Sequence, residues 1–366
     1  MIRVLQVIGS LNNGGSQAMI MNLYRNIDRS KIQFDFIIDR ENELFFAQEI
    51  KALGGKIYIL PTFNFKNILE YPKAWNKFFK EHPEYNIIHG HVRSTASIYL
   101  RIAKKYGLTA IAHSHSTSSG TGFSAIVKNI LQYKIRYIAD YFFACSKSAG
   151  IWLFGEKVFK EDNFYILKNA IDINSFIYDE KKRIEKRKEL NIEGKFVIGH
   201  IGRFSSSKNH NFLIDVFKEI HQRESNAVLI LVGDGKLRYS IENKVDDLGL
   251  GNNVIFTGVS SDIPELLQAM DVFVFPSLYE GLGIVAIEAQ AAGLQCIVSD
   301  EVPQMATVTN MIKRISLKDG EKIWANHILH YKNRYNRKDN SKYILECGYD
   351  IKSTSQWLEK FYIDSL

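Results

Sequence analysis

The residues best suited to chemistry lie in the segment PSLYEGLGIVAIEAQAAG, which holds two glutamates, Glu280 and Glu288. Eight positions span a little over two helical turns, so Glu288 should lie on one face of a helix whose N-terminus follows Glu280. A carboxylate can accept hydrogen bonds from sugar hydroxyls, which suits Glu288 to a ribose and Glu280 to a second sugar. Free amides at the turn, from Leu282, Gly283 and Ile284, could bind a phosphate. An ordinary helix face is the alternative, but the surrounding glycines favour a site.

Two cations follow the predicted strand VIGHIG. Gly202 and Arg203 come at its end, and Lys208 stands after a polar turn, next to a predicted helix. A planar guanidinium and a mobile ammonium can together neutralise a diphosphate leaving group as its charge grows. A solvated basic loop is the alternative, although cations at a helix N-terminus oppose its dipole and need an anion as compensation.

Two glycine turns offer bare backbone after predicted strands. Gly14 and Gly15 precede a predicted helix, where an anion could meet the amides. Gly258 and Val259 follow the run VIFT, where backbone could approach a flat base. Either turn could also be purely structural. The first glycines do not fit the G-x-G-x-x-G fingerprint, which argues against a dinucleotide oxidoreductase.

Four histidines, His89, His91, His113 and His115, stand at the ends of two predicted strands. Such a gathering is compatible with a metal site, but no carboxylate or thiol accompanies it at ligand spacing. Alternate residues of a strand point the same way simply because of the pleat. We therefore expect these imidazoles to face a substrate or the core, and we expect no metal ion.

Short apolar runs alternate with longer helical patterns along the whole chain, an order typical of α/β parallel sheets. The pattern predicts two doubly wound Rossmann-like domains, residues 1–175 and 176–345, the second cycle opening after the charged stretch 179–193. Ligands of such sheets bind beyond the carboxyl ends of the strands, so we expect the two domains to face a central cleft. Residues 346–366 should form a terminal helix that returns to the first domain.

The formal charge of +7 is unevenly distributed. Residues 1–175 hold 22 Lys and Arg against 14 Asp and Glu, and the remainder is nearly balanced. Such asymmetry suits a solvated face, an anionic membrane or a phosphate-bearing substrate better than a nucleic acid, for which no motif is present. The predicted helix 124–138 mixes apolar side chains with Lys128, Lys134 and Arg136, as a helix that docks on a membrane would. Plain packing explains that pattern equally well.

No signal-peptide pattern opens the sequence, and no apolar run reaches the length of a membrane span. The three cysteines, Cys145, Cys296 and Cys347, are too far apart in sequence to suggest a zinc site or a redox pair. We expect buried thiols in a reducing compartment. The sequence thus predicts a cytoplasmic protein, with peripheral contact to the inner face of the cell membrane as a further hypothesis.

On these residues the chain resembles the retaining GT-B glycosyltransferases, a large family that includes capsular and exopolysaccharide sugar transferases and mannosyltransferases of bacterial lipid glycans. The family's two glutamates, separated by seven residues, match Glu280 and Glu288. Its Gly-Arg followed by lysine matches Gly202, Arg203 and Lys208. The resemblance covers nearly the whole chain.

Other features of the family match less specifically. Its Gly-Gly loop resembles Gly14 and Gly15, its turn before the second domain resembles residues 168–172, and its cleft histidine falls in AHSHS. Counting along the strand favours His115 over His113 for that histidine, by one alternate position. The turn carries Ala170, a departure from the usual glycine.

The resemblance implies a UDP- or GDP-activated sugar donor, retention at the anomeric carbon, no metal or other cofactor, and closure of the domains. Arg203 and Lys208 would stabilise the leaving phosphates, and His115 would orient the donor sugar. Segment 303–317 and the run CIVSD resemble the capsular and exopolysaccharide subgroup, which implies a lipid-linked saccharide acceptor carried by undecaprenyl. A nucleotide-sugar epimerase and a non-catalytic partner subunit of the same fold remain alternatives.

Overall fold

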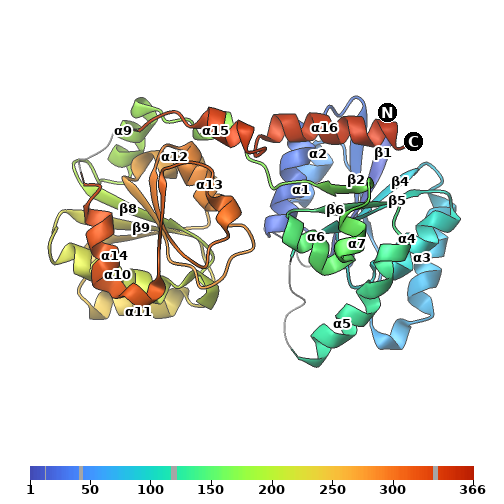
Figure 1. Ribbon diagram of the computed structural model, residues 1–366, viewed down its shortest axis with the longest axis horizontal. Helices are drawn as coiled ribbons and strands as arrows, with labels where there is room; N and C mark the ends of the chain where they lie inside the picture. The colour runs from blue at the N-terminus through green and yellow to red at the C-terminus, as the bar shows by residue number, and fades with distance from the viewer. Residues whose placement is uncertain (13, 41–43, 117–121, 333–336) are drawn as a thin grey trace. The chain divides into compact units, whose positions relative to one another are not determined.

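The computed structural model describes the chain except residues 13, 41–43, 117–121 and 333–336, and gives no side-chain description of residues 123–125 (Figure 1). It divides into two compact units. Unit 1 comprises Met1–Ile171 together with Gly348–Leu366, and unit 2 comprises Asp172–Cys347. Each unit is an α/β domain with a parallel sheet, as the alternating pattern predicts. The expectation that the two sheets enclose a cleft stays a prediction.

Within the described residues, unit 1 forms a seven-stranded parallel sheet of order β3-β2-β1-β4-β5-β6-β7. Its strands are β1 (Ile2–Val7), β2 (Ile32–Ile38), β3 (Ile57–Ile59), β4 (Ile87–Gly90), β5 (Thr109–Ser114), β6 (Tyr141–Ala144) and β7 (Phe164–Ile166). Its helices are α1 (Gly15–Asn26), α2 (Ala47–Ala52), α3 (Glu70–Glu81), α4 (Ala96–Lys105), α5 (Phe123–Tyr133), α6 (Lys147–Phe154), α7 (Glu156–Phe159) and α16 (Ile351–Asp364). Every residue of β2 is buried, which explains its nearly continuous apolar run IQFDFII.

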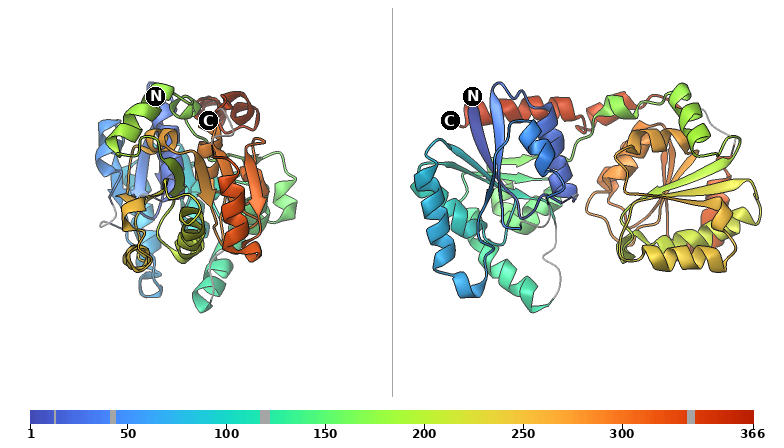
Figure 2. Two further views of the ribbon diagram at one scale, coloured as in Figure 1. Left: turned by 90° about the vertical axis from the view of Figure 1, so that its left-hand side faces the viewer. Right: turned by 180° about the vertical axis from the view of Figure 1, so that it is seen from behind.

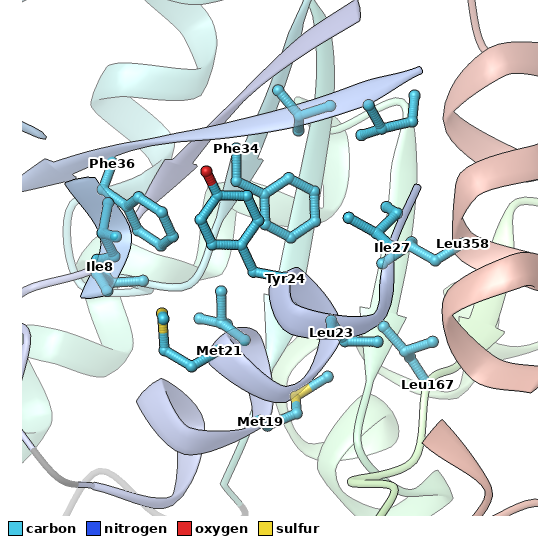
Figure 3. Packing of buried hydrophobic residues seen from close by; sticks show 14 of the residues in the cluster. Ile8, Met19, Met21, Leu23, Tyr24, Ile27, Phe34, Phe36, Leu167 and Leu358 are labelled. Atoms are coloured by element: carbon cyan, nitrogen blue, oxygen red, sulfur yellow. The ribbon is translucent and has the colours of Figure 1, made fainter. Parts of the chain in front are cut away.

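The helices of unit 1 cover both faces of its sheet (Figure 2). Side chains of α1, α2 and α16 pack on one face, and side chains of α3, α4 and α6 pack on the other. The terminal helix α16 therefore returns to the first domain. Figure 3 shows Leu358 of α16 beside Ile27 and Leu167, in the same core as Tyr24, whose ring stacks on Phe34 with centroids 5.2 Å apart.

Unit 2 forms, in its described residues, a six-stranded parallel sheet of order β10-β9-β8-β11-β12-β13. Its strands are β8 (Phe196–Ile201), β9 (Ala227–Val232), β10 (Val254–Gly258), β11 (Val272–Phe275), β12 (Gln295–Ser299) and β13 (Ile312–Ile315). Its helices are α8 (Ile173–Phe176), α9 (Glu180–Glu189), α10 (His210–His221), α11 (Arg238–Asp247), α12 (Ile263–Ala269), α13 (Ile284–Ala291), α14 (Gly320–Leu329) and α15 (Ser341–Glu346).

The second cycle of strands begins with β8 after the charged stretch 179–193, as predicted, but the hydrophobic pattern missed a helix in that stretch. Most of that stretch is α9, inside unit 2, capped by the Asp179 side chain. The helix has few apolar residues, and charge pairing helps to hold it in place. Buried Lys186 of α9 donates to Asp262 at 2.6 Å and to Glu189 at 2.8 Å. The hydrophobic pattern also missed β13 and α14.

Two smaller expectations also differ from the structure. Of the three thiols expected to be buried, only Cys296 is; Cys145, which follows β6, and Cys347, which follows α15, are half-buried. The predicted helix 124–138 divides into α5 and a 3₁₀ turn, η2 (Lys134–Tyr137).

We expect Leu358→Ala to lower the free energy of unfolding of unit 1 by about 2–5 kcal/mol, because it leaves a cavity in a core where Leu358 is 1% exposed. Hydrogen exchange of peptides along a urea series measures this, and the loss of protection should be confined to unit 1. Lys352→Ala, an exposed change on the same helix, is the control. Equal loss of protection in unit 2 would contradict the assignment of α16 to unit 1.

Candidate active-site residues in each unit

In unit 2, the loops after β8 and β11 bring Lys208 to Glu280. The two strands are neighbours in a parallel sheet, so the loops at their carboxyl ends lie side by side. Lys208 Nζ donates to Glu280 Oε1 at 2.5 Å, and Ser277 Oγ donates to the same oxygen at 2.7 Å. The ammonium also lies 4.6 Å from the ring centroid of Phe275. The Glu280 side chain is only 9% exposed, so the pair is shielded from water. Two opposite charges attract each other more strongly in such a shielded place than in water.

The backbone of the two loops holds this ion pair. Lys208 ends a 3₁₀ turn, η3 (Ser206–Lys208), and Asn209 takes a left-handed φ of 56° before α10 begins. The amide of Leu278 donates to the carbonyl oxygen of Ser207 at 2.8 Å, which ties one loop to the other. Arg203, three residues before η3, is exposed. The structure thus brings Lys208 to Glu280 and leaves Arg203 at the surface.

Helix α13 separates the two glutamates as their spacing predicts. Gly283 precedes the helix with a φ of 79°, a conformation that glycine adopts without strain. Glu280 lies in the loop before it, and half-buried Glu288 lies on the helix itself. Burial raises the pKa of Glu288 to about 7. At neutral pH this carboxyl group therefore exists in both protonation states.

The glycines of the neighbouring loops have a structural role. A Cβ atom on Gly233 would lie 2.3 Å from the carbonyl oxygen of Gly202, and the Gly233 amide donates to Gly258 O at 2.8 Å. Gly258 itself has a φ of 72°. The loops after β8, β9 and β10 are therefore packed backbone to backbone, and the side chain of Val259 next to them is exposed.

In unit 1, Gly14 and Gly15 lie at the start of α1, and Asn13 of the same loop lies outside the described residues. Gly14 is the N-cap residue, and the helix has no acidic residue in its first turn. A Cβ atom on Gly15 would meet nothing within 4 Å. A ligand could therefore approach the amides at this helix N-terminus closely.

The four histidines of unit 1 form one stack. His89 lies in β4 and His113 in β5, which pair as neighbours, and His91 and His115 follow the ends of these strands. The ring centroids are 4.5 Å apart for His89 and His91, and 4.1 Å apart for His113 and His115. His113 is 2% exposed and packs against Phe143, whereas His115 is half-buried.

Burial keeps this stack uncharged. It lowers the pKa of His89 to about 3 and of His115 to about 4, and it lowers the pKa of His91 and His113 well below the ordinary value. Nearby charges act in the same direction, since each imidazolium would repel its neighbours and Arg93 would repel that of His115. The four rings are therefore neutral at pH 7.

Ring nitrogens of His89, His91 and His113 lie within 4.8 Å of one another, close enough to share a metal ion. His89 Nε2 and His113 Nδ1 are, however, hydrogen-bonded to each other at 3.1 Å. A metal ion on these atoms would have to replace that bond. The expectation that the protein works without a metal stays a prediction.

Both halves of the chain match known families. Residues 13–175 match the family described as Glycosyltransferase Family 4, and residues 181–343 match the family Glycosyl transferases group 1. Over 360 residues the chain is 34% identical to a Bacillus subtilis protein named as the glycosyltransferase EpsF, with 96% of this chain and 93% of the relative covered. The chain belongs to the glycosyltransferases.

Further similarities place this glycosyltransferase within the family. It is 27% identical over 228 residues to the Escherichia coli UDP-Gal:alpha-D-GlcNAc-diphosphoundecaprenol alpha-1,3-galactosyltransferase, covering 59% of this chain and 58% of the relative. Its fold matches that of HepE from Anabaena, solved in complex with UDP, with a TM-score of 0.82, 19% identity and full coverage of both chains. The glycosyltransferase therefore has the GT-B fold.

Sequence reasoning missed several side chains around the candidate site of the glycosyltransferase. Ser277 and Phe275 contact the Lys208–Glu280 pair, and the motif itself could have indicated Ser277, which stands three residues before Glu280. Gln6 and Tyr362 contact the histidine stack. No local signal indicates Tyr362, because it lies 273 positions from its partner His89.

In the part of the glycosyltransferase that the structure describes, no helix has both the length and the apolar character needed to cross a membrane.

We expect Glu288→Gln to stabilise unit 2 more at pH 8 than at pH 5. The folded-state pKa of Glu288, about 7, lies above the unfolded value of about 4.3, so the stability that Glu288 contributes below pH 4 is lost as the pH rises through 7. The amide has no proton to lose, and the gain at pH 8 should be about 1–3 kcal/mol in urea unfolding.

Glu301→Gln, a change at an exposed glutamate of unit 2, is the control for this experiment and should show no such pH dependence. A stability difference between wild type and Glu288→Gln that is the same at both pH values would contradict the raised pKa.

Proposed function

We propose that this glycosyltransferase transfers a hexosyl or N-acetylhexosaminyl group from a UDP-sugar to a saccharide, with retention of anomeric configuration and without a metal ion. The observation that carries the proposal is the shielded pair of Lys208 and Glu280, in which Glu280 lies in the loop before α13, the helix that carries Glu288. The UDP complex of HepE supports the choice of nucleotide.

In this proposal, different residues of unit 2 bind different parts of the donor. Lys208, released from Glu280, neutralises the diphosphate as it leaves, and Arg203 supplies a second cation from the surface. The amides from Leu282 to Ile284 bind phosphate oxygens, and Gly202, Gly258 and Val259 border the base. Glu288 accepts hydrogen bonds from the ribose hydroxyls, and Glu280 accepts them from the donor sugar.

The reaction is a front-face substitution. The acceptor hydroxyl oxygen bonds to the anomeric carbon while the bond from that carbon to the phosphate oxygen breaks. The hydroxyl proton passes to the departing diphosphate, so no enzymic base is needed. In unit 1, His115 contacts the reacting sugar, and Gly15, next to Gly14 at the start of α1, leaves space for the substrate.

We further propose that the acceptor is a lipid-linked saccharide, carried by undecaprenyl diphosphate, in the synthesis of a capsule or exopolysaccharide at the cytoplasmic face of the membrane. The support is the galactosyltransferase of Escherichia coli, whose name describes such an acceptor. An epimerase would convert the donor without an acceptor, and a non-catalytic subunit would not need Lys208, Glu280 and Glu288 together.

We expect UDP to raise the thermal stability of the protein equally with and without EDTA.

Lys208→Ala and Glu280→Ala should lower kcat for sugar transfer by about 10²–10³-fold while the circular dichroism spectrum stays unchanged, because each removes a charge that acts in the transition state. Lys236→Ala and Glu301→Ala, at exposed residues of unit 2, are the matched controls. Wild-type kcat in both site variants would remove the pair from the mechanism.

The proposed membrane contact is supported by an exposed apolar face on α5 and η2. Ile126, Ile130, Tyr133 and Tyr137 follow each other at helical spacing, and each is between 51% and 73% exposed. Figures 1 and 2 show α5 extending away from the sheet of unit 1. An amphipathic helix with such a face can lie in the headgroup region of a bilayer.

Charge around this face favours an anionic bilayer. Between Glu84 and Asp140 the sequence holds seven Lys or Arg residues and no Asp or Glu. Arg101 and Lys134 border a hollow of about 540 Å³ next to the rings of Tyr133 and Tyr137. A lipid phosphate there would meet cations, and the tyrosines suit the interface between headgroups and acyl chains.

We expect the protein to float with vesicles of phosphatidylglycerol and phosphatidylcholine at low salt, and less at high salt. Ile126→Ser with Ile130→Ser should weaken binding by roughly tenfold or more, because two apolar side chains no longer enter the bilayer. Ile184→Ser is the control, since Ile184 of α9 is as exposed as Ile126. Equal flotation of both variants would show that this face does not dock.

A further inference from the structure

The histidine stack of unit 1 is hydrogen-bonded to two side chains that lie far from it in the sequence. Gln6 of β1 contacts both Tyr362 of α16 and His91, and Tyr362 contacts His89. We call these six residues, Gln6, Tyr362 and the four histidines, the imidazole network. Gln6 is 1% exposed and Tyr362 is fully buried, so water does not compete for their hydrogen bonds.

The first branch of the network starts at the amide nitrogen of Gln6. Gln6 Nε2 donates to the Tyr362 hydroxyl oxygen at 3.3 Å, so Tyr362 must donate its own proton to His89 Nδ1, 2.6 Å away. Burial raises the pKa of Tyr362 above its ordinary value, so this proton is always present. His89 then carries its proton on Nε2.

From His89 the branch reaches His113. His89 Nε2 donates to His113 Nδ1 at 3.1 Å, which leaves the proton of His113 on its own Nε2. That buried nitrogen has no partner among the residues that the structure describes. The first branch therefore ends in a donor.

The second branch starts at the amide oxygen of Gln6. This oxygen accepts from His91 Nε2 at 2.8 Å, so His91 Nδ1 bears a lone pair and accepts from His115 Nε2 at 2.7 Å. The remaining nitrogen of His115, Nδ1, is buried like Nε2 of His113; it is left as an acceptor and has no partner within the described part of the chain. The second branch therefore ends in a lone pair.

We propose that Gln6 and Tyr362 are positioning residues that fix all four histidines in the Nε2–H tautomer, so that Nδ1 of His115 remains the unpaired acceptor of the network. The assignment rests on the proposed function only in taking His115 as the group that meets the sugar. The orientation of the Gln6 side-chain amide determines which ring nitrogen of each histidine is protonated. If the amide were flipped, donor and acceptor would exchange in every hydrogen bond of both branches.

The chemical consequence concerns which substrate group His115 can meet. A neutral imidazole with a free Nδ1 lone pair accepts a hydrogen bond from a sugar hydroxyl and does not repel the positive charge that develops at an anomeric carbon. A cationic His115 would repel that charge, and an Nδ1–H tautomer would instead donate to a phosphate oxygen. The tautomer fixed by the network therefore favours a sugar hydroxyl over a phosphate oxygen as the partner of His115.

Long-range ¹H–¹⁵N correlation spectra of the full-length protein, labelled on histidine, test this assignment directly at pH 7.5. We expect Nδ1 shifts of unprotonated nitrogen for His89, His91, His113 and His115. Four Nδ1–H tautomers would mean the opposite amide orientation and would overturn the assignment, as would a protonated ring at His115.

Two variants separate the branches. Tyr362→Phe removes the donor to His89, so His89 and His113 should become tautomer mixtures while His91 and His115 keep Nε2–H. Gln6→Met removes the acceptor of His91 and should release His91 and His115 as well. Tyr165→Phe, which removes a hydroxyl beside α16 without touching the network, is the control. Unchanged tautomers in both Tyr362→Phe and Gln6→Met would overturn the proposal.

Kinetics link the network to the reaction. We expect Gln6→Met to lower kcat severalfold with little change in UDP affinity, because unit 2 binds the nucleotide. Expected tautomer changes with wild-type kcat would overturn the role of Gln6 as a positioning residue and leave the proposed transfer standing. Expected tautomers in a protein that transfers no sugar would instead refute the proposed function, since the spectra do not depend on activity.

Discussion

The candidate chemistry of both units depends on the pairing of parallel strands, which places the carboxyl ends of neighbouring strands at one edge of each sheet. In unit 2 the pairing of β8 with β11 brings Lys208 to Glu280, although 72 positions separate them. In unit 1 the pairing of β4 with β5 stacks His89 and His91 against His113 and His115. The backbone hydrogen bonds between strands thus bring together side chains that are far apart in the sequence.

The ion pair in unit 2 has a cost as well as a use. Two charges removed from water are stabilised only by each other and by nearby dipoles, here the Ser277 hydroxyl and the ring of Phe275. An incoming diphosphate and sugar would replace these partners with stronger ones. In the proposed reaction, the pair would thus keep both groups oriented and desolvated before the substrate arrives.

The sequence predicted the fold well because central parallel strands are buried on both faces and read as apolar runs between helical patterns. It failed at α9, where Lys186 is held by carboxylates instead of apolar contacts. The position of Glu280 and Glu288 around α13 followed from helical periodicity and one glycine. The sequence could not predict the contact of Lys208 with Glu280 or that of Tyr362 with the histidine stack. These contacts depend on the strand order and on the packing of α16, which are set by the tertiary structure.

The return of α16 makes unit 1 discontinuous: residues 172–347 of unit 2 separate the first 171 residues from the helix that completes their core. On the ribosome, unit 2 can therefore be fully synthesised while unit 1 still exposes the apolar surface that Leu358 and Tyr362 later cover. Completion of the chain, and not of either sheet, is the event that closes the first core. A nascent or prematurely terminated chain would present that open surface to chaperones and proteases.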